Sequence, residues 1–212
     1  MSEHVLHVAS FFAIVSSLVL LSVFFAPWWL VNDDHHPNET FQRLGLWTAC
    51  FKDANVSHTE SSTQCSWIYF DDLSKHNITI PAFFTVTQAL FTLCVVFLIL
   101  ISLPALTRYF YVLEGERSKI NLLFIISGCL IFSALCGTAA IIVFCAFSTE
   151  QQWVPNIEHK IIGTAYYTAV ICIFFEWIAS LLVFLKFLEE RGKNRNDQFT
   201  LIDANDFSVY TL

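Results

Sequence analysis

Four long apolar blocks constrain this chain more than any other feature. They cover residues 9–31, 82–106, 120–147 and 161–185, and the first three contain no Asp, Glu, Lys or Arg. Each is longer than the roughly 20 residues that a helix needs to cross a hydrocarbon core about 30 Å thick. Since lipid offers no partner for unpaired backbone groups, the blocks predict helices. We therefore expect an all-α membrane bundle of four transmembrane helices.

The polar segments between the blocks define the expected organisation. The predicted spans are 9–31, 80–106, 120–147 and 161–185, joined by segments 32–79, 107–119 and 148–160, with an N-terminus at 1–8 and a tail at 186–212. A cleaved signal peptide is the alternative for the first block. That block is too long for a signal sequence, no Lys or Arg precedes it, and it ends in the bulky Pro27, Trp28 and Trp29.

Two features predict the orientation. Seven of the 11 Lys and Arg residues lie in segments 107–119 and 186–212, which favours the cytosol for both. All three N-glycosylation sequons lie in segment 32–79, at Asn38, Asn55 and Asn77. We expect a multi-pass plasma-membrane glycoprotein with cytoplasmic N- and C-termini and a large, acidic first loop outside the cell.

The cysteines divide by environment. Five of the seven lie in predicted spans, and only Cys50 and Cys65 lie in the first outer loop. Two thiols in an oxidising compartment, closing a loop of about 15 residues, favour a mutual disulfide worth about 3 kcal/mol in the chain-entropy model. An intermolecular bridge or two free thiols are the alternatives.

The residues around Cys50 resemble a known family signature. Pro27-Trp28-Trp29 precedes Gly45-Leu46-Trp47-Thr48-Ala49-Cys50, and Cys65 follows. This order resembles the superfamily of claudins, peripheral myelin proteins, epithelial membrane proteins and calcium-channel gamma subunits, with the motif residues Trp29, Gly45, Leu46, Trp47, Cys50 and Cys65. The segment between the two cysteines is longer than usual in that family, which indicates a divergent member, such as a claudin-like protein of invertebrate septate junctions. Gln88 and residues 163–167 extend the likeness into the second and fourth spans.

The resemblance implies a small extracellular antiparallel β-sheet, built from the first outer loop and part of the second, on a left-handed four-helix bundle. Residues 66–70 are rich in β-preferring side chains and agree with a strand there. Leu46 and Trp47 would seat the sheet on the helix ends, and Gly45 would permit a tight backbone approach. For Trp28, Trp29 and Trp153, an interfacial aromatic belt is the alternative reading.

Glu176 is the one acidic or basic residue inside a predicted span. An acid within the membrane is costly unless it is neutral or paired, so Glu176 is a candidate functional residue. It also resembles a Glu in the fourth span of the gamma-subunit branch. The alternative is a protonated side chain that bonds to a neighbouring helix, through Gln88 or a serine hydroxyl.

Two pairs of small residues stand four positions apart in the spans. They are Ser133 with Gly137 and Ala165 with Ala169. Such pairs let helix backbones approach closely, so we expect them to pack the bundle, with oligomerisation as the lesser alternative.

Catalysis has no support in the sequence, which shows no nucleophile and base arrangement, phosphate-binding glycine loop or metal-ligand spacing. We expect no enzyme, no cofactor, no metal and no nucleic-acid partner. A metal or acid-sensing site at the loop histidines, and a cation path at two loop aspartates, are less favoured alternatives; the residues are His35, His36, His58, His76, Asp71 and Asp72.

The polar tail 186–212 is predicted to be unstructured until it is bound. Its last residues, Tyr210, Thr211 and Leu212, fit a loose pattern for a cytoplasmic PDZ-domain scaffold. The resemblance implies a structural protein of tight or septate junctions, which contributes to adhesion, paracellular barrier and junction assembly in epithelium. Such a protein would oligomerise with claudin-like proteins on the same and on neighbouring cells. The alternative is an auxiliary subunit that binds an ion channel or receptor within the membrane.

Overall fold

The computed structural model describes residues 3–32, 41–52, 63–69, 80–111, 116–148, 153 and 160–209. Its helices are α1 (Glu3–Phe25), α2 (Ala82–Val96), the π-helix η2 (Phe97–Ser102), α3 (Leu103–Tyr111), α4 (Glu116–Phe147) and α5 (Thr164–Val209). Its strands are β1 (Leu30–Asn32), β2 (Phe41–Leu44), β3 (Thr48–Lys52), β4 (Thr63–Trp67) and β5 (Lys160–Ile162).

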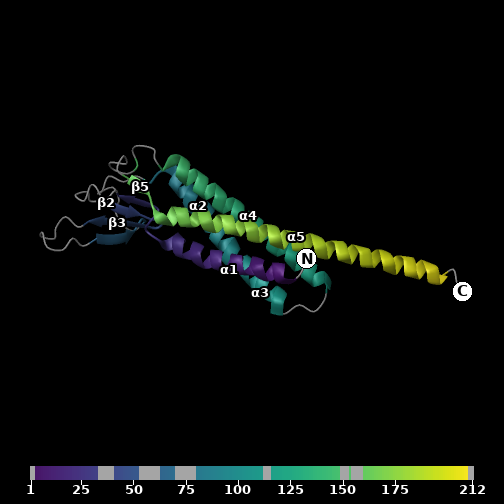
Figure 1. Cartoon of the computed structure of the whole chain (residues 1–212). Coiled ribbons are helices and arrows are strands. Elements are labelled where there is room, and N and C mark those ends of the chain that lie inside the picture. The colour runs from purple at the N-terminus through teal and green to yellow at the C-terminus, as the bar shows by residue number, and fades with distance from the viewer. Residues whose placement is uncertain are drawn as a thin grey trace.

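Four helical segments of the described chain are long and apolar enough to cross a membrane. They are His4–Phe25, Ala82–Phe110, Lys119–Phe147 and Thr164–Gln198, and the second runs continuously through α2, η2 and α3. The helices lie side by side, the sheet caps one end of the bundle, the N-terminus lies at the other end, and α5 extends well past that end towards the C-terminus (Figure 1). The predicted fold class, a four-helix membrane bundle with a small antiparallel sheet, is confirmed. The protein is therefore a multi-pass membrane protein.

The sheet has the strand order β4-β3-β2-β1-β5, and each neighbouring pair is antiparallel. Strands β1 to β4 come from the first loop, whereas β5 comes from the segment before the fourth span and pairs with β1, Leu30 opposite Ile162. The sheet therefore joins the entry to the fourth span with the exit from the first.

Two helices and one strand end at residues other than those that the sequence predicted. The first apolar block continues to Val31, but α1 ends at Phe25 because Pro27 disfavours helical backbone in the residue before it. Strand β4 ends at Trp67, so residues 68 and 69 form a turn rather than a strand. The tail was expected to be unstructured, yet α5 continues to Val209. The pair Lys186 and Glu190, at 2.7 Å and four residues apart, stabilises this extension.

The small residues of α4 face the neighbouring helices. A side chain on Gly137 would meet Ile173 of α5 at 2.9 Å and the Cys94 sulfur of α2 at 3.1 Å. Ser133 donates from Oγ to the Cys94 carbonyl at 2.8 Å. This pair therefore lets α4 approach α2 and α5 closely, as expected for bundle packing.

Candidate functional site

The candidate site is the sheet and its attachment to the bundle. We use "sheet seat" for Trp29, Gly45, Leu46, Trp47 and Gln88, which join the sheet to the ends of the helices. The first four are residues of the predicted motif, and the fifth lies on α2.

Trp29 lies where the chain leaves α1 and enters the sheet. Its side chain is fully buried, and Nε1 donates to the Val23 carbonyl of α1 at 3.0 Å. Its ring packs edge-on against Phe91 of α2, Phe144 of α4 and Tyr166 of α5, at centroid distances of 5.1, 5.2 and 6.3 Å. One tryptophan therefore contacts all four spans, which is core packing rather than a place in an exposed aromatic belt.

Gly45 lies between β2 and β3, against the turn that follows α1. A Cβ atom on Gly45 would lie 2.4 Å from the Ala26 carbonyl oxygen and 2.8 Å from the Pro27 α-carbon. The neighbouring Leu44 carbonyl accepts a hydrogen bond from the Trp29 amide at 2.9 Å. Glycine is required here because the two backbones touch.

Gln88 connects the sheet to α2 through two hydrogen bonds. Its side chain is buried, its Nε2 donates to the Leu46 carbonyl at 2.5 Å, and its Oε1 accepts from the Tyr69 hydroxyl at 2.7 Å. Leu46 itself is fully buried. A glutamine in an otherwise apolar span therefore holds both the β2–β3 turn and the residues after β4.

Trp47 is half-buried between the bundle and the sheet. Its ring packs edge-on against Phe24 of α1, at a centroid distance of 5.3 Å, and stacks on Trp67 of β4 at 5.7 Å. Its buried Nε1 atom has no hydrogen-bond partner among the residues that the structure describes. The contribution of Trp47 is therefore apolar packing.

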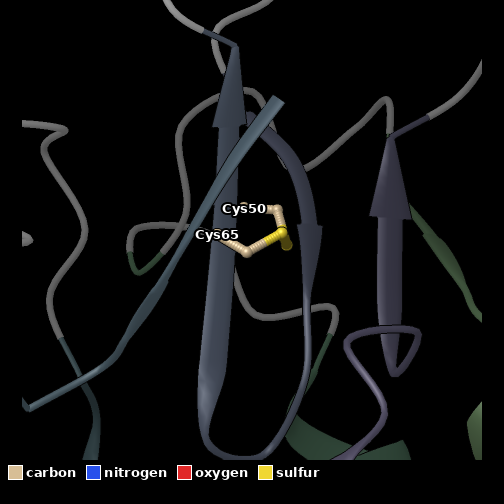
Figure 2. Close-up of a disulfide and its surroundings, with 2 residues drawn as sticks. All are labelled: Cys50 and Cys65. Atoms are coloured by element: carbon tan, nitrogen blue, oxygen red, sulfur yellow. A yellow bond between two sulfur atoms is a disulfide. The ribbon is translucent and has the colours of Figure 1, made fainter. Parts of the chain in front are cut away.

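Cys50 and Cys65 form the disulfide, with sulfurs 2.06 Å apart. They are directly opposite each other in the register of β3 and β4 (Figure 2). The bridge closes a loop of about 15 residues and fixes two strands of the sheet to each other. The predicted intramolecular pairing is thus confirmed.

Glu176 lies inside the bundle, far from the sheet in sequence and fully buried. Its Oε2 lies 3.9 Å from the Cys94 sulfur of α2, while Oε1 has no hydrogen-bond partner in the described part of the chain. Gln88, one of the two partners that the sequence offered, bonds to the sheet instead. Ser133 donates to the backbone of Cys94, next to the carboxyl group.

Several predicted site residues lie outside the described part of the chain. They are the sequon residues Asn38, Asn55 and Asn77, the C-terminal Tyr210, Thr211 and Leu212, the histidines His35, His36, His58 and His76, and the aspartates Asp71 and Asp72.

Some important residues were not singled out as site residues from the sequence. Gly163 donates from its amide to the Trp29 carbonyl at 2.9 Å, and a Cβ atom on it would lie 2.0 Å from the Trp28 carbonyl oxygen. Phe91, Phe144 and Tyr166 look like ordinary apolar span residues in the sequence. Their role in holding the sheet on the bundle is visible only in the structure, where all three rings pack against the Trp29 indole.

The sheet seat is built for mechanical attachment. Among the described residues, no group of three or more His, Cys, Asp or Glu side chains is placed to hold a metal ion. The arrangement couples a covalently clamped sheet to all four spans through glycine contacts, aromatic packing and the Gln88 hydrogen bonds.

Comparison with known proteins gives the family. A family model described as "PMP-22/EMP/MP20/Claudin tight junction" matches residues 4–185, which include the first three spans, most of the fourth and all five described strands. The chain is also similar to Clc-like protein 5 of Caenorhabditis elegans, at 27% identity over 223 residues, covering 92% of this chain and 78% of the relative. Because the family model matches most of its length, the chain belongs to the PMP-22/EMP/MP20/Claudin family.

Proposed function

We propose that this protein is a structural component of cell–cell junctions, where its sheet meets claudin-like proteins in the same membrane and on the neighbouring cell. The observation that best supports this role is the attachment of the sheet to the bundle through Trp29, which packs against all four spans. A contact made by such a sheet is transmitted to the membrane without a flexible hinge. Membership of a family of structural membrane proteins also favours this role over an enzymatic one.

The two edges of the sheet offer contact surfaces. Trp67 on the edge strand β4 and Ile161 on the edge strand β5 are 38% and 50% exposed. Tyr69, just after β4, is 56% exposed. Large exposed apolar side chains on the edge strands of a sheet are typical of protein–protein contacts.

In this role, the sheet lies outside the cell and both termini lie in the cytosol. The basic residues of segments 107–119 and 186–212 support this orientation. Both termini lie at the end of the bundle away from the sheet, as the orientation requires (Figure 1). Asn38, Asn55 and Asn77 would then be available for glycosylation, and the last three residues, 210–212, for a PDZ scaffold.

The alternative, an auxiliary subunit of a channel or receptor, drew support from Glu176. A side chain that binds a second membrane protein must reach the lipid-facing surface. Glu176 is 0% exposed and lies against α2. We therefore favour the junction role, and Glu176 fits an internal role in packing.

The test is expression of the tagged, full-length chain in fibroblasts that form no such junctions. We expect the protein to accumulate at contacts between two expressing cells, and less at contacts with a non-expressing cell, because adhesion needs a sheet on both sides. The matched control replaces both Cys50 and Cys65 by Ser, which removes the clamp and should abolish the enrichment. Equal surface density at both kinds of contact would refute adhesion, and an unchanged tracer flux across epithelium after removal of the protein would refute a barrier role.

A further inference from the structure

A polar groove lies at the end of the bundle opposite the sheet. It consists of two cavities of about 220 Å³ each, both lined by Tyr109 of α3, Lys119 of α4 and Glu190 of α5. One cavity continues to Lys193, and the other reaches His7 of α1. Residues from all four spans therefore line the groove, and none of the sheet seat residues does.

The groove follows α5 from the membrane surface outwards. Lys186 lines one cavity and Lys193 the other, and seven residues of helix separate them, about 10 Å along the axis. Leu185 and Leu188 on the same helix are 40% and 46% exposed, which is typical of a surface that faces lipid. Phe110 lines the cavity next to Lys186 and is 37% exposed. One end of the groove is thus beside lipid, and the other end projects away from it.

The lysines on α5 are balanced by glutamates on the same helix. Lys186 lies 2.7 Å from Glu190 and 3.3 Å from Glu189, and Lys193 lies 3.6 and 3.4 Å from the same two carboxylates. The positive charges of these two lysines are therefore offset by the negative charges of the two glutamates. Lys119 reaches the groove from α4 and has no ion pair within 4.0 Å among the residues that the structure describes.

The far end of the groove carries the opposite charge. Asp197 lines the cavity that holds Lys119 and Lys193, and it likewise forms no ion pair with a described residue. Arg191 and Arg195, which line neither cavity, add positive charge on the exposed surface of α5 beside it. Lys119 is therefore the groove cation that no described carboxylate pairs with, and Asp197 carries the opposing charge at the far end of its cavity.

We propose that this groove binds a phospholipid whose headgroup carries phosphate beyond the diester, that is, a lipid of the phosphoinositide class. Basic pockets between membrane helices on the cytosolic side suit such headgroups, since several ammonium groups can surround one phosphate. The diester phosphate would lie at the Lys186 end, beside lipid, and the outer phosphate would contact Lys119 and Lys193. Asn194 lines the same cavity, and its side-chain amide is a neutral hydrogen-bond donor. The inference rests on the proposed cytosolic position of this end, but not on the junction role.

The experiment measures lipid binding by the full chain in nanodiscs. Discs of phosphatidylcholine are compared with discs that also hold either phosphatidylserine or phosphatidylinositol 4,5-bisphosphate, and the lipids retained are counted by native mass spectrometry. Both faces of a nanodisc are accessible, so failure here would not bear on orientation or adhesion. We expect retention of the bisphosphate lipid at least tenfold above phosphatidylserine. Equal retention of both anionic lipids would overturn the phosphoinositide assignment.

Two double variants test whether the lipid binds in the groove or only to the positive surface of α5. Replacing Lys119 and Lys193 by Gln should weaken retention about 30-fold, which corresponds to about 1 kcal/mol for each cation. The matched control, Arg191→Gln with Arg195→Gln, removes the same charge outside the groove and should cost no more than about threefold, because these positions are screened by solvent. Equal losses in the two double variants would refute the groove.

Two further variants show whether a loss of binding reflects unfolding, and whether the charge of Asp197 opposes binding. Lys119→Arg with Lys193→Arg keeps both charges and should keep binding within about threefold. Asp197→Asn removes the opposing carboxylate and should tighten binding several-fold, whereas weaker binding would contradict the proposed placement. Competition by soluble inositol trisphosphate as strong as that by the lipid would show that the ligand is a free headgroup, and would overturn a membrane ligand.

Discussion

Gly45 offers the sharpest test of how the sheet is attached to the bundle. In the variant Gly45→Ala, the added methyl group would lie 2.4 Å from the Ala26 carbonyl oxygen and 2.8 Å from the Pro27 α-carbon. Ordinary contacts begin at 3.4 Å, so the two backbones must separate by about 1 Å. Neither obstacle is a side chain that can rotate away.

The expected cost follows from this geometry. Overpacking a tight site typically costs about 1–3 kcal/mol, and we expect the upper end of that range because both neighbours are backbone atoms. For a chain of about 200 residues, a loss of about 3 kcal/mol lowers the melting temperature by roughly 6–12 °C. The separation should also strain the hydrogen bond from the Trp29 amide to the Leu44 carbonyl, at 2.9 Å, since it lies next to Gly45.

The assay is thermal unfolding of the purified protein in detergent, together with hydrogen exchange of the β2 and β3 amides. The matched control is Gly128→Ala on α4, where an added Cβ meets nothing within 4 Å. Alanine is the better helix former, so this variant should melt at the wild-type temperature or slightly above it. If Gly45→Ala melted with the wild type and its sheet amides kept their protection, the close approach would be irrelevant to stability.

Three further predictions concern the clamp, the hydrogen bonds to α2 and the buried acid. Replacing both Cys50 and Cys65 by Ala should cost about 3 kcal/mol and speed proteolysis of the sheet; unchanged protease resistance would contradict this. Gln88→Leu should cost about 2–3 kcal/mol in thermal unfolding, because the buried Leu46 carbonyl loses its side-chain donor; a neutral result would show that the bond contributes nothing. Glu176→Gln should change stability by less than about 1 kcal/mol, since Oε1 makes no hydrogen bond with a described residue; a large loss would reveal a role for the carboxyl group itself.

The four spans could be predicted from the sequence because crossing lipid imposes one demand on every residue of a helix. About 20 consecutive apolar residues are visible without knowing any neighbour. The disulfide could also be predicted, because Cys50 and Cys65 are the two cysteines outside the predicted spans. The register that places them opposite each other in β3 and β4 could not be predicted, since a strand's partner depends on residues far along the chain.

The sheet seat was predicted only in part. Gly45, Leu46 and Trp47 stood out through family resemblance, but the partners that make them matter are distant in sequence. The Leu46 carbonyl is bonded by Gln88, 42 residues later, and Trp29 packs against Tyr166 from the fourth span. No periodicity or composition shows such contacts before the chain has folded.

A local signal misled at the C-terminal tail. A polar, charged tail indicated an unstructured segment, yet residues from Lys186 onwards continue α5, because the helix is already formed and charged pairs four residues apart extend it. The sequence left two roles open for Glu176, a functional acid within the membrane or a protonated side chain bonded to a neighbouring helix. Its full burial against α2 could be seen only in three dimensions.

Every role proposed above requires a disulfide-clamped sheet that stands outside the cell on a four-helix bundle. The most direct measurement is labelling of intact cells with a membrane-impermeant maleimide, before and after treatment with an impermeant reductant, on a variant that keeps only Cys50 and Cys65. We predict no labelling of the untreated cells and labelling of both thiols once the reductant is added. Labelling without reduction, or labelling only after the membrane has been permeabilised, would contradict the account.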